Sequence, residues 1–115
     1  MMALIEKYRV VVECVTMLLA AALEVGGDAL IRAGLRSSGW LLVVAGFVVL
    51  GSYGVVVNLL PMDFSRLLGT YVAFFAVVSV LFGKIAFGET IPASTWVGLA
   101  VIVAGSAIIQ VGRFM

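Results

Sequence analysis

The chain has 115 residues, of which 64% are hydrophobic and 11% are charged, and its net charge is +1 with no histidine. A soluble domain averages about 45–50% apolar and about 25% charged residues, so this composition excludes a water-soluble globular protein and indicates an integral membrane protein. The near-neutral charge argues against a nucleic-acid partner, and the lack of histidine removes the commonest general base and metal ligand.

Long apolar stretches at residues 10–33, 40–60, 67–82 and 94–111 predict four transmembrane helices. Strands of a membrane barrel would alternate between polar and apolar residues, and these stretches do not. Because each span takes about 20 residues, four spans use up the chain. This predicts an all-α membrane protein with a single four-helix domain over residues 1–115. The sequence shows no nucleophile–base pair and no metal-ligand cluster, so neither an enzyme nor a bound cofactor is expected.

The first stretch carries three ionisable side chains at positions where a spanning helix is still inside the bilayer. Glu24, Asp28 and Arg32 are spaced four residues apart, so on an α-helix they form one polar stripe. An ionisable side chain near the bilayer centre costs roughly 2.5–3.5 kcal/mol on insertion scales. We therefore expect the stripe to face a bundle interior or a wet cavity, with Glu24 as the residue that binds a proton or a cation.

Each member of the stripe also has a structural interpretation. Arg32 could neutralise Glu24 as a static pair, although two helical turns separate them. Asp28 is one turn from both, and an ion pair with Arg32 competes with a role in binding. Glu13, near the start of the stretch, is expected to extend its carboxylate to the water interface.

The second and third stretches contain small and aromatic residues that bear on packing. Trp40 begins the second stretch and is typical of the membrane interface. Gly46, Gly51 and Gly54 follow it and predict close approach to another helix. In the third stretch, Tyr71 belongs either to the wall of a binding pocket or to ordinary packing.

The fourth stretch contains three regularly spaced glycines. Gly98, Gly105 and Gly112 recur every seven residues, which places them on one side of a helix. Such a stripe allows another helix to pack closely. The spacing leaves open whether that helix belongs to the same chain or to a second one.

The basic residues give little preference for one orientation in the membrane. With four spans, one side would receive four basic residues and the other side three. The four are Lys7, Arg9, Arg66 and Arg113, and the three are Arg32, Arg36 and Lys84. Because an excess of basic residues normally fixes the cytoplasmic side, we expect that this chain can insert both ways round.

Over essentially its full length the chain resembles the small multidrug resistance transporters and their relatives in the drug/metabolite transporter superfamily. The resemblance depends on a first-helix glutamate with a basic residue eight positions later, a Phe-Gly-Glu turn before the last helix, and two last-helix glycines followed by isoleucines. The matching residues are Leu23, Glu24, Val25, Gly27, Arg32, Phe87, Gly88, Glu89, Gly98, Gly105, Ile108 and Ile109.

The resemblance implies an antiparallel homodimer of four-helix chains in the inner membrane, with both copies supplying a Glu24. In that arrangement Gly98, Gly105 and Gly112 would pack the two copies together. Glu24, Asp28 and Tyr71 would be the substrate- and proton-binding residues, with Arg32 as a charge partner. The chain departs from the family's exporters early in the third helix. Their aromatic pair is absent there, and residues 65–69 read Ser-Arg-Leu-Leu-Gly.

The leading hypothesis is a proton-coupled antiporter that exports small organic or hydrophobic cations. Burial in a low dielectric disfavours the charged form of a carboxyl group, so one acid can hold either a proton or a cation but not both. One four-helix chain is too small to enclose a cavity, whereas two opposed copies would supply inverted symmetry. Two alternatives remain: a non-transporting accessory or scaffold subunit of a larger membrane complex, and a subunit that translocates a lipid-linked substrate.

Overall fold

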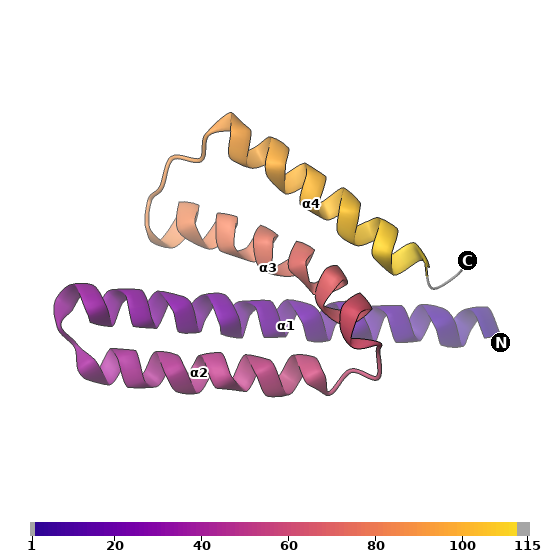
Figure 1. The fold of residues 1–115 in the computed structure, drawn as a ribbon, viewed down its shortest axis with the longest axis horizontal. Helices are drawn as coiled ribbons and strands as arrows, with labels where there is room; N and C mark the ends of the chain where they lie inside the picture. Colours follow the sequence, from indigo (N-terminus) through magenta and orange to yellow (C-terminus); the bar gives the residue numbers. More distant parts are fainter. Residues whose placement is uncertain (1, 113–115) are drawn as a thin grey trace. The chain divides into compact units, whose positions relative to one another are not determined.

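The computed structural model describes residues 2–112 and builds them almost entirely from helices. The helices are α1 (Met2–Ser37), α2 (Trp40–Asn58), α3 (Phe64–Ala86) and α4 (Ala93–Val111) (Figure 1). Within the described range all four are long and apolar enough to cross a membrane, and no strand is present. The prediction of an all-α membrane protein with four spanning helices is therefore confirmed. Arg113, which entered the count of basic residues, lies outside the described range.

The chain divides into two compact units, and each contains a pair of consecutive helices. The first unit, Met1–Pro61, contains α1 and α2, and the second, Met62–Met115, contains α3 and α4. In both units the two helices run in opposite directions, as short connections require. Residues 38–39 join α1 to α2, and residues 87–92 join α3 to α4.

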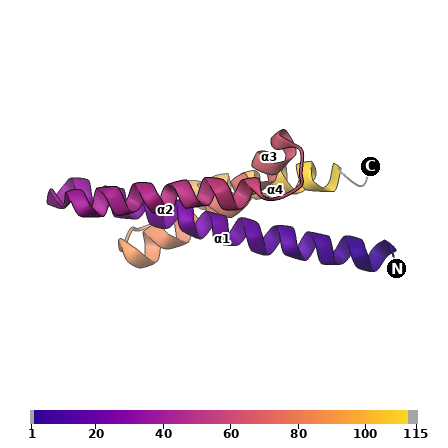
Figure 2. The same cartoon turned by 90° about the horizontal axis from the view of Figure 1, so that it is seen from below.

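Helix α1 is much longer than its partner. It has 36 residues and α2 has 19, so at about 1.5 Å per residue they measure about 54 Å and about 28 Å. Only α2 matches the bilayer core of about 30 Å, and α1 continues past the end of α2 (Figure 2). The apolar stretch predicted at 10–33 lies inside α1, which begins earlier because Ala, Leu, Glu and Lys favour helix.

The turn between α1 and α2 is compact and hydrogen-bonded. Ser38 has a φ of 59°, the left-handed conformation with which helices commonly end. The Gly39 N–H then donates to the Gly34 carbonyl at 2.8 Å. Two connecting residues suffice, so α2 returns directly along α1.

Glycines bring the backbones of α1 and α2 into contact. A Cβ added at Gly27 would lie 2.9 Å from the Gly46 carbonyl oxygen and 2.9 Å from the Leu50 nitrogen. One at Gly46 would lie 2.7 Å from the Gly27 carbonyl oxygen, and one at Gly34 would lie 2.9 Å from the Val43 nitrogen. These distances leave no room for a methyl group, so only glycine permits this approach.

Of the three glycines predicted to allow close approach on α2, only Gly46 does so in the described chain. Gly51 and Gly54 have no described atom within 4 Å of an added Cβ. Only the side of α2 with Gly46 faces α1, so for Gly51 and Gly54 close approach to another helix stays a prediction. The glycines of α1, Gly27 and Gly34, complete the contact instead.

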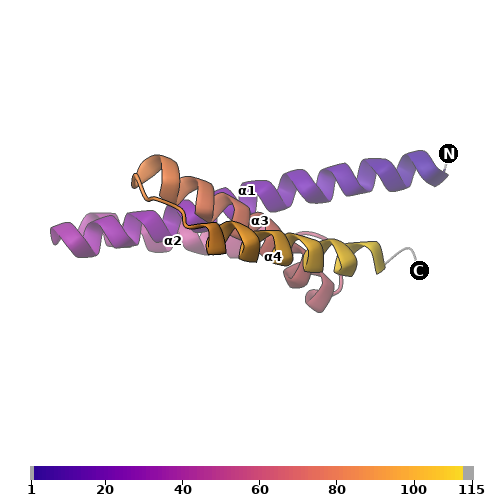
Figure 3. The ribbon, with the colours of Figure 1, turned by 90° about the horizontal axis from the view of Figure 1, so that it is seen from above.

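The Phe-Gly-Glu turn is the cap that ends α3 (Figure 3). Gly88 has a φ of +63°, which glycine adopts without a side-chain clash. The N–H groups of Phe87 and Glu89 both donate to the Gly83 carbonyl, at 3.2 Å and 3.1 Å. The Glu89 side chain lies against Gly83, where a Cβ would collide with its carboxylate.

Helices α3 and α4 are joined by polar contacts at one end and leave a groove further along. The Ser106 hydroxyl donates to the Gly69 carbonyl at 2.7 Å, and the Thr70 hydroxyl donates to the Gln110 side-chain carbonyl at 3.4 Å. The groove between the two helices is almost entirely apolar. It is lined by Val72, Phe75, Ala76, Ser79, Val80, Thr95, Gly98, Leu99 and Ile102.

Candidate functional site

Glu24 lies on the side of α1 that faces α2, and the glycine contacts fix which residues of α2 are level with it. Along α1 from the turn the contact positions are Gly34, Ile31 and Gly27, and along α2 they are Val43, Gly46 and Leu50. The next step of three residues reaches Glu24 on α1 and Tyr53 on α2. The two positions therefore face each other, and both side chains are half-buried.

This level is deep within the span. Leu50 is close to the middle of α2, and Gly27 is packed against its backbone. Glu24 and Asp28, on either side of Gly27, therefore lie in the central part of the membrane-spanning hairpin. A carboxylate at such a depth costs roughly 2.5–3.5 kcal/mol unless it meets polar partners or water.

The predicted polar stripe is present on α1, but its members do not share one environment. Glu24 is half-buried, whereas Asp28 and Arg32 are exposed on the single chain. At 3.6 residues per turn, each four-residue step rotates the side chain by about 40°. The stripe therefore turns away from α2 toward the open surface of α1.

The expectation that the Glu13 carboxylate reaches the water interface was wrong. The exposed fraction of Glu13 is 3%, so the side chain is buried in the folded chain. Position in an apolar stretch indicates depth along a helix, but which side of the helix is covered depends on the tertiary fold.

Tyr71 belongs to the second unit, near the start of α3. Its exposed fraction is 3%, and its ring centroid lies 6.4 Å from that of Phe75, one turn further along the same helix. A tilted aromatic pair of this kind stabilises packing. A role in substrate binding stays a prediction.

The heptad glycines of α4 face open space. An added Cβ at Gly98, Gly105 or Gly112 would meet no described atom within 4 Å. Within the second unit these glycines therefore do not bring α4 into close contact with α3. Exposed aliphatic side chains accompany them on α4, among them Val97, Val101 and Ile108.

Tyr53 is the candidate site residue that the sequence reasoning missed. The signal was available, because a very short turn at residues 38–39 makes positions equally far from it face each other. Glu24 and Tyr53 are such positions. The apolar stretch around Tyr53 gave no other indication of a site, since a lone tyrosine in a long apolar helix is common.

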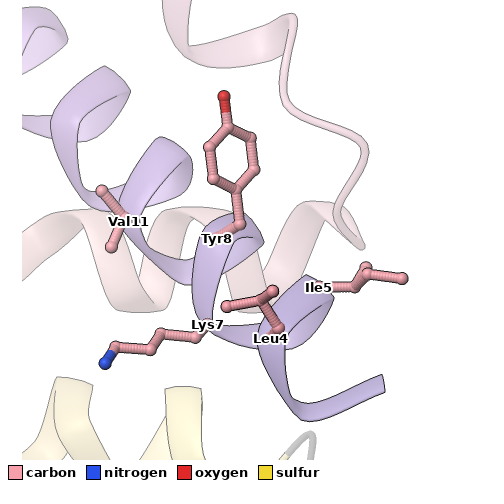
Figure 4. Close-up of a pocket in the computed structure, with 5 residues that line it drawn as sticks. All are labelled: Leu4, Ile5, Lys7, Tyr8 and Val11. Atoms are coloured by element: carbon pink, nitrogen blue, oxygen red, sulfur yellow. The ribbon is translucent and has the colours of Figure 1, made fainter. Parts of the chain in front are cut away.

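A separate hollow lies on the N-terminal part of α1, lined by Leu4, Ile5, Lys7, Tyr8 and Val11. Its surface is largely apolar, and the Lys7 ammonium and the Tyr8 hydroxyl point away from one another (Figure 4). The two polar groups therefore do not converge on a ligand. Across residues 2–112, no group of three Cys, Asp or Glu side chains could hold a metal ion.

Comparison with known proteins identifies relatives over most of the chain. Residues 10–114 match a family described as "Uncharacterised BCR, YnfA/UPF0060 family". A UPF0060 membrane protein of Mycolicibacterium gilvum is 37% identical over 103 residues, covering 88% of this chain and 95% of the relative. One from Streptomyces coelicolor is 37% identical over 93 residues, covering 79% and 83%. No solved structure matches the chain.

Proposed function

The chain belongs to the YnfA/UPF0060 family of membrane proteins, and we propose that it is a proton-coupled antiporter that exports small organic or hydrophobic cations. The main support is Glu24, a half-buried acid in the central part of a spanning hairpin. A carboxylate is retained at that depth chiefly where it serves an ion or substrate pathway. The proposed location is the bacterial inner membrane.

In the proposed mechanism Glu24 binds a proton and a cation alternately. Exclusion of water favours the protonated, neutral form of the acid. A cation that displaces the proton restores charge balance at the site. If the cavity opens to one side at a time, each turnover exchanges a proton for a cation.

The proposed active form contains two copies in opposite orientations. The nearly balanced basic residues permit both insertions. Two opposed copies would reproduce the inverted symmetry that larger transporters obtain from internal repeats. The open glycines of α4 would be the contact between copies, because small residues allow close packing of membrane helices.

Glu24→Gln tests the proposal, since it preserves side-chain shape and removes titration. Purified protein in liposomes with an acidic interior should accumulate tetraphenylphosphonium, and a proton ionophore should abolish this uptake. Glu24→Gln should lower uptake at least tenfold, whereas the matched variant Glu89→Gln, in the exposed turn after α3, should leave it unchanged. Equal uptake by Glu24→Gln and wild-type protein would contradict the proposal.

The exposed charges of α1 favour a second candidate, an accessory subunit of a larger membrane complex. Asp28 and Arg32 are exposed in the spanning helix, and a different membrane protein could cover them. The composition of the particle purified in mild detergent separates the candidates. Two copies of this chain alone agree with the antiporter, and a stoichiometric second protein agrees with the accessory subunit.

A further inference from the structure

The register of the first hairpin is fixed on both sides of Glu24. On the side near the turn, Gly27 packs against the backbone of Leu50. On the other side, the next level contains Ala20 and Val57, whose exposed fractions are 0% and 1%. Glu24 and Tyr53 lie between these two packed levels, so their facing positions follow from the backbone.

Tyr53 is also the polar side chain of α2 that lies at the level of Glu24. The other two polar side chains of α2 are committed to their own helix. Ser52 donates to the Val48 carbonyl at 2.9 Å, and Asn58 donates to the Gly54 carbonyl at 2.7 Å. On α1 itself, the charged neighbours of Glu24 are Asp28 and Arg32, one and two turns away on the exposed side.

We propose that Tyr53 is a positioning residue whose hydroxyl donates a hydrogen bond to the ionised carboxylate of Glu24. This deepens the proposed function, because it takes Glu24 to be the group that protons and cations share. The phenol holds the empty carboxylate in one orientation. It also satisfies one of the carboxylate's acceptor sites when neither a proton nor a cation is bound.

A donor to a carboxylate stabilises the charged form. Tyr53→Phe keeps the ring and removes this donor, so Glu24 should retain its proton to higher pH. The expected shift in the midpoint of its titration is about one pH unit upward. The pH profile of cation uptake should move in the same direction.

The titration is measured on full-length protein in lipid nanodiscs with 13C-labelled glutamate carboxyl groups. The chain has four glutamates, Glu6, Glu13, Glu24 and Glu89, and Glu24→Gln assigns the Glu24 signal by its loss. Tyr8→Phe is the matched control, because it makes the same chemical change at an exposed position near the start of α1. An unchanged Glu24 midpoint in Tyr53→Phe, or an equal shift in Tyr8→Phe, would overturn the proposal.

A second measurement needs no tyrosine variant. In protein with labelled tyrosine, the Tyr53 ring signal should follow the Glu24 titration, and this response should vanish in Glu24→Gln. No response of Tyr53 in the wild-type protein would also overturn the proposal. Both readouts are independent of transport, so a Glu24–Tyr53 pair without tetraphenylphosphonium uptake would reject the antiporter and keep the pair. Tetraphenylphosphonium uptake without a Glu24–Tyr53 pair would reject the pair and keep the antiporter.

Discussion

Gly46 shows how much one missing side chain determines in this protein. It lies where the backbone of α2 meets that of α1, and an added Cβ would lie 2.7 Å from the Gly27 carbonyl oxygen and 2.9 Å from the Ile31 nitrogen. Both neighbours are backbone atoms of a packed helix, so neither can move independently. The facing positions of Glu24 and Tyr53 therefore depend on a residue that contacts neither of them.

Gly46→Ala should destabilise the first hairpin by about 1–3 kcal/mol, the usual cost of forcing extra volume into packed structure. Gly51→Ala is the matched control, because its Cβ would enter open space in the described chain. Denaturation of the purified variants in mixed detergent micelles measures the difference. Equal stability of the two variants would show that the backbones do not approach as closely as described.

At the scale of single residues, the sequence predicted Glu24 as a site residue but did not predict Tyr53. An acid within an apolar stretch is visible by composition alone. A tyrosine in an apolar helix becomes informative only when the register across the turn is known. Register depends on the two-residue connection and on Gly27, Gly34 and Gly46, whose pairing no single stretch reveals.

At the scale of elements, the two hairpins are held by different means. Helices α1 and α2 meet through their backbones, whereas α3 and α4 are linked by side chains such as Ser106, which donates to the Gly69 carbonyl at 2.7 Å. An apolar groove separates α3 and α4 further along. The second hairpin therefore depends more on individual hydrogen bonds.

Ser106→Ala should weaken the α3–α4 pair by about 0.6 kcal/mol, the average measured for hydrogen bonds between membrane helices, with an upper limit of about 1.7 kcal/mol. Ser52→Ala provides the comparison, since the Ser52 hydroxyl donates within its own helix to Val48. Unfolding in mixed detergent micelles, followed by helical circular dichroism, gives both values. A Ser106→Ala protein as stable as Ser52→Ala would mean that this bond does not hold the pair.

The helices themselves were predictable, but their full lengths were not. Hydropathy located a span at 67–82, and the structure extends α3 over Phe64–Ala86. Apolar composition marks the part of a helix inside the bilayer, whereas the helix continues until a cap ends it. For α3 that cap is Gly88, with its positive φ, and for α1 it is Ser38.

For the whole molecule, the open glycines of α4 bear on assembly. An added Cβ at Gly98, Gly105 or Gly112 would meet no described atom within 4 Å, so α3 does not pack closely on this stripe. The sequence revealed the stripe through its spacing but left its partner open. Because α3 does not pack closely on this stripe, the stripe is open to a partner from outside the second unit.

If α4 joins two copies, Gly105→Leu should convert the purified particle from two copies to one while preserving helix content. Gly51→Leu is the control, because Gly51 is equally open but lies on α2. Light scattering that separates protein from detergent mass reports the copy number. Dissociation by Gly51→Leu and not by Gly105→Leu would place the contact on α2 and reject this assembly.

The two-residue connection after α1 also bears on biogenesis. Ser38 and Gly39 are too few to form a water-exposed loop of their own, so α1 and α2 should leave the ribosome and enter the lipid together. The sidedness is then chosen for the two helices together, before α3 enters the lipid. Later basic residues such as Lys84 should consequently have less influence on the final orientation than Lys7 and Arg9.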